Sequence, residues 1–205
     1  MARSDVQLML SVKAGDEESF ELLLRKYRTP LVNFLYRMVR DTAVAEDLAQ
    51  EVFLRVYRAR KEYSPSAKFT TWMFRIATNL ALNSIRDGRH RQLEISIDTP
   101  AEGDDRPFEV PSRDVAADTQ MIERDRAEFI KRAVMSLPEK QRAAVLLHKY
   151  QEMDYDEIAR TLECSESALK SLLFRAYETL RVQLAPLVAP PGSPAVADAG
   201  KGRQS

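Results

Sequence analysis

The sequence predicts an all-α protein made of two small helical domains joined by a flexible acidic linker. Three observations predict this class. Apolar residues recur at spacings of three and four over most of the chain, as they do in amphipathic helices. Only 6 of the 205 residues are glycine, so the tight hairpins of a β fold are not expected. Two segments without apolar periodicity, 94–118 and 186–205, divide the chain into blocks.

These two segments set the expected domain boundaries. One helical domain spans 1–93 and a second spans 119–185. The segment 94–118 contains eight acidic residues, two basic residues and three prolines, which is typical of an extended linker. The tail 186–205 is rich in Pro, Ala and Gly, and we expect it to be disordered.

Composition excludes several classes of function. Formal net charge is +0, so any nucleic-acid surface must come from local charge separation. One cysteine, Cys164, and two scattered histidines make neither a disulfide framework nor a metal site. No phosphate-binding loop or catalytic constellation is evident. Without a signal peptide or a long apolar run, the chain is expected to be cytoplasmic, with no cofactor, no metal, no catalytic residue and no membrane insertion.

The first domain begins with a helical pattern capped by Asp16. Pro30 interrupts the apolar positions, so the pattern indicates either one helix kinked there or two helices meeting. Asp41 then looks like the cap of a helix over 42–58, whose valines and leucine repeat every four residues. The opposite face of this helix carries Asp47, Gln50, Glu51 and Arg55.

A basic helix follows the loop 61–68. Five Lys or Arg residues lie between Lys68 and Arg91, against one acidic residue. One face of the helix carries Arg75, Asn79, Asn83 and Arg86. Arg and Asn are suited to bidentate contacts with base edges, and Arg also neutralises phosphate. The alternative is an ordinary solvated face. Trp72 lies on the apolar stripe, which favours a core position over base stacking.

The second domain contains a helix-turn-helix pattern. Pro138 stands at an expected first helical position, and Asp154 with Glu157 forms a capping box for a short helix. Ser165 is suited to cap a second, longer helix. Such a second helix enters the major groove by its N-terminal part, where the candidate contacts are Ser167, Lys170, Ser171, Phe174 and Arg175. The alternative is a helical hairpin without DNA contact.

Three segments resemble, in order and spacing, an extracytoplasmic-function (ECF) sigma factor of the sigma-70 family. They are DLAQEVFLRVYR (47–58), FTTWMFRIATNLALNSIR (69–86) and LPEKQRAAVLLHKYQEMDYDEIARTLECSESALKSLLFRAYETLR (137–181). The resemblance covers both helical blocks and leaves out the linker and the tail. It implies a sigma region two over 1–93 and a sigma region four over 119–185. The implied function is to bind core RNA polymerase and direct initiation at promoters with particular −35 and −10 elements.

The resemblance also implies roles for individual residues. Those expected to read and melt the −10 element are Lys68, Thr70, Thr71, Arg75, Asn79, Asn83 and Arg86. Those expected at the −35 element are Ser167, Lys170, Ser171, Phe174 and Arg175. The face with Asp47, Gln50, Glu51 and Arg55 resembles the surface that docks on the clamp helices of polymerase β′. The β flap of polymerase, promoter DNA and an anti-sigma factor are the other implied partners.

Two residues depart from the family pattern. Glu163 stands in the helix-turn-helix turn where glycine is usual, at a position of positive φ. Either Glu163 adopts this conformation at a cost of about 1 kcal/mol, or the turn is built differently. Leu172 stands where a basic residue is usual, off the apolar stripe, and offers a contact for another protein such as an anti-sigma factor.

Other functions remain open from the sequence. A free-standing repressor or activator would need a dimer interface for paired half-sites, and no heptad seam is evident. A sigma-like decoy that only binds an anti-sigma factor would not need the base-reading face of the basic helix, although Glu163 and Leu172 favour it. An enzyme has no supporting residues.

Overall fold

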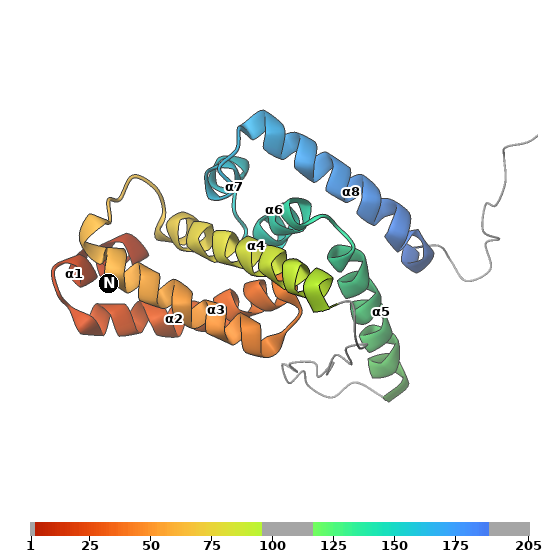
Figure 1. Ribbon diagram of the computed structural model, residues 1–205, viewed down its shortest axis with the longest axis horizontal. Helices are drawn as coiled ribbons and strands as arrows, with labels where there is room; N and C mark the ends of the chain where they lie inside the picture. The colour runs from red at the N-terminus through yellow and green to blue at the C-terminus, as the bar shows by residue number, and fades with distance from the viewer. Residues whose placement is uncertain (1–2, 96–116, 189–205) are drawn as a thin grey trace, which may run out of the picture.

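The computed structural model describes residues 3–95 and 117–188, with side chains described for 3–88 and 123–187. Helices make up this part of the chain and it contains no strand, which confirms the predicted all-α class. In chain order the helices are α1 (Asp5–Lys13), α2 (Glu17–Val39), α3 (Thr42–Arg58), the 3₁₀ turn η1 (Ala59–Glu62), α4 (Phe69–Ile95), α5 (Ala117–Met135), α6 (Glu139–Tyr150), α7 (Tyr155–Thr161) and α8 (Glu166–Val188) (Figure 1).

Helix α1 is an element that sequence analysis did not assign. The Ser4 hydroxyl accepts from the Gln7 backbone N–H at 3.3 Å, and the Gln7 side chain accepts from the Ser4 N–H at 2.9 Å. This reciprocal capping box satisfies two N–H groups that the first helical turn leaves unpaired. Three apolar side chains of α1 are buried: Leu8, Met9 and Val12. A short helix is thereby fixed at both its start and its inner face.

Helix α2 is one continuous helix that contains Pro30, so the single-helix alternative is the correct one. Proline lacks an N–H, and the hydrogen bond lost is the one to the carbonyl of Lys26, on an exposed turn of the helix. The apolar face of α2 is buried through Leu23, Tyr27, Leu31, Phe34, Leu35 and Met38. The Phe34 ring meets Phe74 of α4 edge to face, with the ring centroids 5.2 Å apart.

The second half of the chain forms the predicted helix-turn-helix. Asp154 and Glu157 make the expected capping box on α7, at 2.9 and 3.1 Å. The Ser165 hydroxyl accepts from the Ala168 N–H at 3.2 Å, as expected of a cap on α8. The predicted apolar positions of α8 are buried: Leu169, Leu173, Ala176 and Leu180. Pro138 precedes the first residue of α6 and acts as its N-cap, one position earlier than predicted.

Several expected boundaries fall inside helices. Helix α4 continues to Ile95 and α5 begins at Ala117, so both ends of the predicted linker 94–118 are helical, while 96–116 lies outside the described residues. No proline follows α4 before Pro100 to end it earlier. Helix α8 includes Pro186 and ends at Val188. Pro186 removes one bond to the carbonyl of Val182, whose side chain is exposed, so water can replace the missing donor. The rest of the predicted tail is also outside the described residues.

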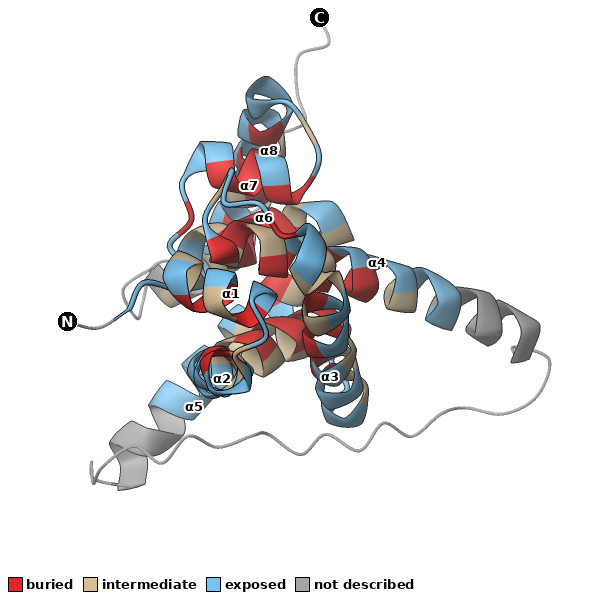
Figure 2. Cartoon of the chain, turned by 90° about the vertical axis from the view of Figure 1, so that its left-hand side faces the viewer, coloured by how far each residue is buried: buried red, intermediate tan, exposed pale blue. Residues whose placement is uncertain are grey.

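Helix α4 lies at the centre of the molecule. It packs on α2 and α3 on one side and against α6 and α7 on the other (Figure 1). Buried side chains concentrate where these helices meet, and the outer faces are exposed (Figure 2). The two halves of the chain are therefore in direct contact, and the basic helix predicted to meet DNA is the element that joins them.

The Asp41 cap on α3 gives a first testable prediction. Its carboxylate accepts from the Val44 N–H at 2.9 Å. We expect Asp41→Ala to lower the free energy of unfolding by about 1 kcal/mol, because one N–H of the first turn loses its partner. Urea titration followed by circular dichroism measures this. Asp41→Asn keeps an acceptor and is the control, and an equal loss in both variants would contradict the role of the cap.

Candidate nucleic-acid and polymerase interfaces

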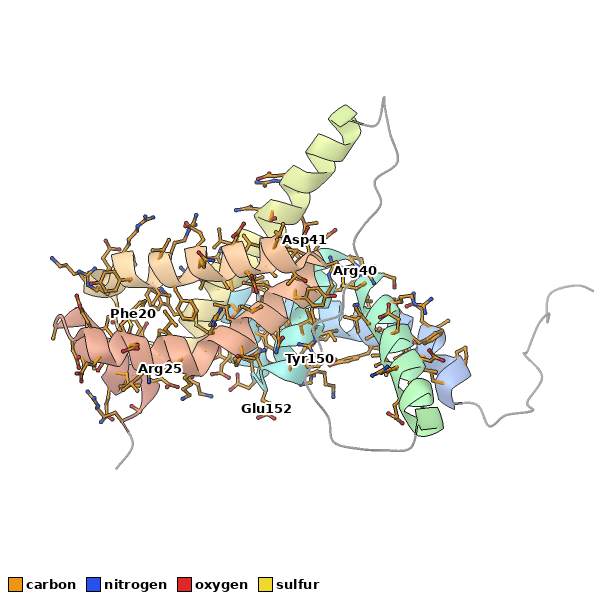
Figure 3. All side chains as sticks on the ribbon, turned by 90° about the horizontal axis from the view of Figure 1, so that it is seen from below. Phe20, Arg25, Arg40, Asp41, Tyr150 and Glu152 are labelled. Atoms are coloured by element: carbon orange, nitrogen blue, oxygen red, sulfur yellow. The ribbon has the colours of Figure 1, made fainter. Side chains whose placement is uncertain are left out.

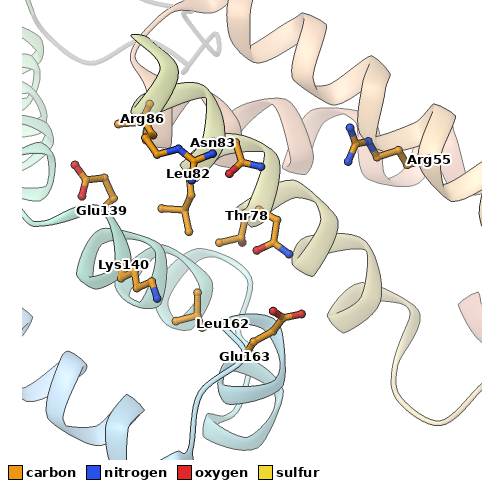
Figure 4. Close-up of a pocket in the computed structure, with 11 residues that line it drawn as sticks. Arg55, Thr78, Leu82, Asn83, Arg86, Glu139, Lys140, Leu162 and Glu163 are labelled. Carbon is orange, nitrogen blue, oxygen red and sulfur yellow. The ribbon is translucent and has the colours of Figure 1, made fainter. Parts of the chain in front are cut away.

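Part of the predicted −10 surface lies in an open groove between the two halves of the chain. Asn79, Asn83 and Arg86 line it from α4, where all three side chains are exposed. The facing wall comes from α6 and from the turn after α7, through Glu139, Lys140, Leu162 and Glu163 (Figure 4). The groove has a volume of about 1000 Å³. The structure thus brings these three predicted residues together in one accessible place.

The other part of that surface is in contact with α7 and with the turn that follows it. The Lys68 ammonium lies 2.9 Å from a Glu157 carboxylate oxygen, and the same oxygen lies 3.5 Å from the Thr71 hydroxyl. Thr71 is buried and Thr70 is half-buried. Arg75 pairs with Glu163 at 3.4 Å, although both side chains stay more than half exposed. The residues predicted to read bases therefore differ in their exposure to solvent, although they lie on or next to one helix.

The carboxylate of Glu157 is the central group of this contact. Its side chain is only 10% exposed, whereas that of Lys68 is 69% exposed. Hydrogen bonding and charge attraction from Glu157 raise the pKa of Lys68, so the ammonium stays charged. The hydroxyl of Thr161 donates to the carbonyl of Glu157 at 2.8 Å, within α7, and lies 3.5 Å from the carbonyl of Thr71 on α4. Sequence reasoning assigned Glu157 to the capping box alone.

The loop before α4 is anchored from the N-terminal helix. The Lys13 ammonium donates to the carbonyl oxygen of Tyr63 at 2.8 Å. The buried Tyr63 ring packs against Trp72, with the ring centroids 5.2 Å apart. Trp72 also meets Phe69, which agrees with the predicted packing position of its ring. Within the loop 61–68, Tyr63 is therefore held by α1 through its carbonyl and by α4 through its ring.

The predicted polymerase-docking residues fall on two sides of α3. Asp47 and Gln50 are exposed, and Glu51 forms an ion pair with Arg55 at 2.7 Å. Gln50 lines a groove between α2 and α3, whereas Arg55 lines the α4 groove with Asn79 and Asn83. Arg55 and Gln50 lie on different sides of α3, because five residues along a helix differ in direction by about 140°.

The groove beside Gln50 is an apolar surface that sequence reasoning missed. Its apolar wall is formed by Phe20, Leu24, Val32, Ala49, Phe53, Leu54 and Tyr57. Phe20 belongs to α2, and its side chain points toward α3, where its ring meets those of Phe53 and Tyr57 (Figure 3). The exposed Leu54 on α3 was the signal available in the sequence, since it lies away from the buried valines of that helix.

The face of α8 that is predicted to contact the −35 element is exposed to solvent. The five candidates at the start of α8 are all exposed: Ser167, Lys170, Ser171, Phe174 and Arg175. Phe174 has 69% of its surface accessible, an unusual position for a large apolar ring. Lys170 pairs with Glu166 one turn earlier, at 2.6 Å. Leu172 is half-buried and so less available to a partner than its place off the apolar stripe suggested.

Glu163 holds the left-handed conformation that the turn requires, with φ of 51°. The turn is therefore not built differently. We expect Glu163→Gly to raise the free energy of unfolding by roughly 0.5–1 kcal/mol, because glycine adopts positive φ without a Cβ clash. Thermal unfolding measures this, with Glu163→Ala as the control that removes the carboxylate and keeps the strain. Destabilisation by the glycine variant would contradict the argument.

The described residues offer neither a metal site nor a membrane span. No group of three or more His, Cys, Asp or Glu side chains is arranged to hold a metal ion. No described helix is both long and apolar enough to cross a bilayer.

Comparison with known proteins assigns both halves of the chain. A family model described as sigma-70 region 2 matches residues 23–91, and one described as sigma-70, region 4 matches 129–180. The RNA polymerase sigma-H factor of Pseudomonas aeruginosa is 31% identical over 90% of this chain and 95% of its own. The ECF RNA polymerase sigma factor SigW of Bacillus subtilis is 29% identical over 84% of this chain and 92% of its own.

Solved structures share the fold. CnrH in complex with the cytosolic domain of CnrY matches with a TM-score of 0.65 and 18% identity, over 90% of this chain and 99% of that one. The sigma factor RpoE from Bartonella quintana, in complex with the anti-sigma factor NepR, matches with a TM-score of 0.65 and 20% identity, over 82% and 98%. The chain therefore belongs to the sigma-70 family and is a sigma factor of the ECF type, which binds core RNA polymerase and directs initiation at particular promoters.

Proposed function

We propose that the first half of this sigma factor reads and melts the −10 element while the second half reads the −35 element. The functional units would be 1–93 and 119–185, with 94–118 as an acidic connection and 186–205 as a tail. The observation that carries the proposal is that the chain has two separate surfaces. Asn79, Asn83 and Arg86 lie together in one groove, and the exposed residues at the start of α8 form the other surface. Two separate surfaces suit two promoter elements separated along the DNA.

Helix α4, together with Lys68 directly before it, supplies the −10 contacts. The proposed set is Lys68, Thr70, Thr71, Arg75, Asn79, Asn83 and Arg86. Asn and Arg at helical spacing can bond base edges, while Lys68 and the threonine hydroxyls suit phosphate oxygens. Melting would draw on binding energy, because holding an unstacked base in a pocket offsets an unstacking cost of a few kcal/mol. The proposal therefore gives the chain no catalytic activity of its own.

Helix α8 supplies the −35 contacts through Ser167, Lys170, Ser171, Phe174 and Arg175. All five lie on its exposed N-terminal part, the part of a recognition helix that enters a major groove. Phe174 offers an apolar contact to a thymine methyl group, and Arg175 a bidentate contact to guanine.

Docking on polymerase would use α3 with the apolar groove beside it. Asp47, Gln50 and Glu51 are the proposed contacts to the clamp helices of β′, and the second half would meet the β flap. An apolar groove rimmed by polar side chains is the usual composition of a protein interface. Arg55 is a weaker candidate than sequence analysis expected, because it lines the α4 groove instead.

The experiment that tests this docking surface is equilibrium binding to purified bacterial core RNA polymerase. We expect Asp47→Lys to raise the Kd by roughly tenfold, because it reverses the charge of an exposed residue in the proposed contact. Glu21→Lys makes the same charge change on an exposed part of α2 and is the control. Equal affinities for the two variants and the parent would rule out the Asp47 face.

An anti-sigma factor is a further proposed partner. The structure of the sigma factor RpoE with the anti-sigma factor NepR shows such a complex for a protein of the same fold. We also propose a cytoplasmic location, because polymerase and promoter DNA are found there in bacteria.

A further inference from the structure

Arg55 is the docking candidate that the structure places on a different surface. It belongs to α3, yet it lines the groove that also contains Asn83 and Arg86 of α4. Gln50, another docking candidate, lines the apolar groove between α2 and α3. In Figure 4 the Arg55 side chain extends from α3 toward α4, where Asn83 and Arg86 are drawn. The cation therefore faces the proposed DNA surface.

The packing of the first half of the chain fixes the place of Arg55. Helix α3 packs against α4, and Val52 and Val56 of α3 are fully buried. Arg55 follows Val52 by three residues and precedes Val56 by one, which places it at the rim of this buried stripe. Its side chain is 52% exposed. Arg55 and the candidate −10 residues of α4 thus belong to one packed unit.

The guanidinium of Arg55 has donors available for a further acceptor. Its Nε–H donates to a carboxylate oxygen of Glu51 at 2.7 Å, one turn earlier on α3. A guanidinium carries five N–H donors in a planar fork. The two terminal amino groups of Arg55 bond no acceptor in the part of the chain that the structure describes. Such amino groups can hold two oxygens of one phosphate.

The wall of the groove formed by α3 and α4 is basic. Among the described residues that line this wall, Arg55 and Arg86 are charged, and the others are neutral: Thr78, Asn79, Leu82, Asn83 and Ile85. The two acidic residues that line the groove, Glu139 and Glu163, belong to the opposite wall. Because DNA carries a negative charge at every phosphate, it is attracted to the α3–α4 wall.

We propose that Arg55 is a DNA-backbone contact, which binds a phosphate of the strand whose bases meet Asn79 and Asn83. The inference rests on the proposed function of α4 in reading the −10 element. The contact adds affinity without sequence preference, because phosphate oxygens are the same at every nucleotide. Helix α3 then serves two partners, polymerase on the side of Asp47 and Gln50 and DNA on the side of Arg55.

The chain offers a matched set of variants for this proposal. Arg55→Gln removes the charge and keeps a polar side chain, whereas Arg55→Lys keeps the charge without the planar fork. Arg25→Gln is the control on α2. Arg25 also pairs with a carboxylate one turn earlier, that of Glu21 at 2.6 Å, and its side chain is 69% exposed. Each Gln variant therefore loses one exposed ion pair within a helix, but only Arg55 lines the groove.

The test measures how salt changes the binding of DNA by the holoenzyme, assembled from the full-length protein and purified core polymerase. The probe is a fragment carrying a promoter that the parent holoenzyme transcribes. We expect Arg55→Gln to weaken binding roughly tenfold at about 0.1 M salt. The slope of log K against log salt concentration should fall by about 0.7–0.9, the value for one phosphate contact. Arg55→Lys and Arg25→Gln should keep the parent slope, and a parent slope in Arg55→Gln would overturn the proposal.

Two further measurements exclude other roles for Arg55. Affinity for core polymerase without DNA should be the same for Arg55→Gln and the parent. A raised Kd for polymerase with the parent salt slope would place Arg55 on the docking surface and overturn the proposal. Single-base changes in the −10 element should alter binding by equal factors in Arg55→Gln and the parent, as expected of a phosphate contact. Unequal factors would make Arg55 a base-reading residue and would also overturn it.

Asn83→Ala distinguishes failure of this contact from failure of the proposed function. We expect Asn83→Ala to reduce the discrimination between −10 sequences, because it removes a base contact. Reduced discrimination in Asn83→Ala, with the parent salt slope in Arg55→Gln, would reject the Arg55 contact alone. Parent behaviour in both variants would reject the assignment of α4 to the −10 element as well.

Discussion

We expect the double variant Asn83→Ala, Arg86→Ala to lose promoter-dependent transcription by roughly two orders of magnitude, since each bidentate base contact contributes about 1–3 kcal/mol. Both side chains are exposed in the α4 groove (Figure 4) and neither belongs to the buried core, so the fold should survive. The measurement is the yield of short transcripts from a promoter that the parent holoenzyme uses, with circular dichroism as the check on folding.

The matched control for this prediction is Arg25→Ala. The Arg25 and Arg86 side chains are 69% and 68% exposed, and each pairs with a nearby carboxylate. Arg25 lies on α2, away from the groove, so its removal should leave transcription within about twofold of the parent, the range of ordinary surface substitutions. Transcription by the double variant at the level of this control would contradict the −10 assignment.

The second large effect is expected in stability. Phe34→Ala should lower the free energy of unfolding by about 3–5 kcal/mol, because it removes a large buried ring and leaves a cavity. Phe34 is 1% exposed and packs against Phe74 at the junction of α2 and α4. Urea titration followed by the fluorescence of Trp72, which lies on α4, reports this directly.

Leu22→Ala provides the comparison on the same helix. Leu22 is 44% exposed, so its removal forfeits little burial and should change the free energy of unfolding by less than about 1 kcal/mol. A similar loss in both variants would show that α2 does not contribute its core face as described. Because α4 rests on α2, Phe34→Ala should also weaken transcription at temperatures where the parent remains folded.

Features set by neighbouring residues could be predicted from the sequence. The caps at Asp16, Asp41 and Ser165 pair with backbone N–H groups within three residues, so a short stretch of sequence contains both partners. The buried face of α8 follows from the 3.6-residue period in the same way. The order of three family-like segments was enough to indicate the family that the comparisons confirm.

Contacts between distant residues could not be predicted in this way. Lys68 and Glu157 are 89 positions apart, and neither local periodicity nor capping brings them together. Thr71 was expected to contact the −10 element, yet its side chain is buried, within 3.5 Å of the Glu157 carboxylate on α7. Arg55 is different, because helical geometry alone could have separated it from Gln50. Helix α1 could also have been found, from the Ser4 and Gln7 capping box.

The central claim is that this chain directs polymerase to promoters through α4 and α8. Its most direct test is run-off transcription with purified core RNA polymerase, the full-length protein and a library of promoter fragments. We expect transcripts with defined start sites whose templates share a −35 and a −10 sequence, and their loss when Asn83 and Arg86 are both replaced by Ala. Tight binding of fragments without any polymerase-dependent transcript would contradict the claim and favour a free-standing DNA-binding protein.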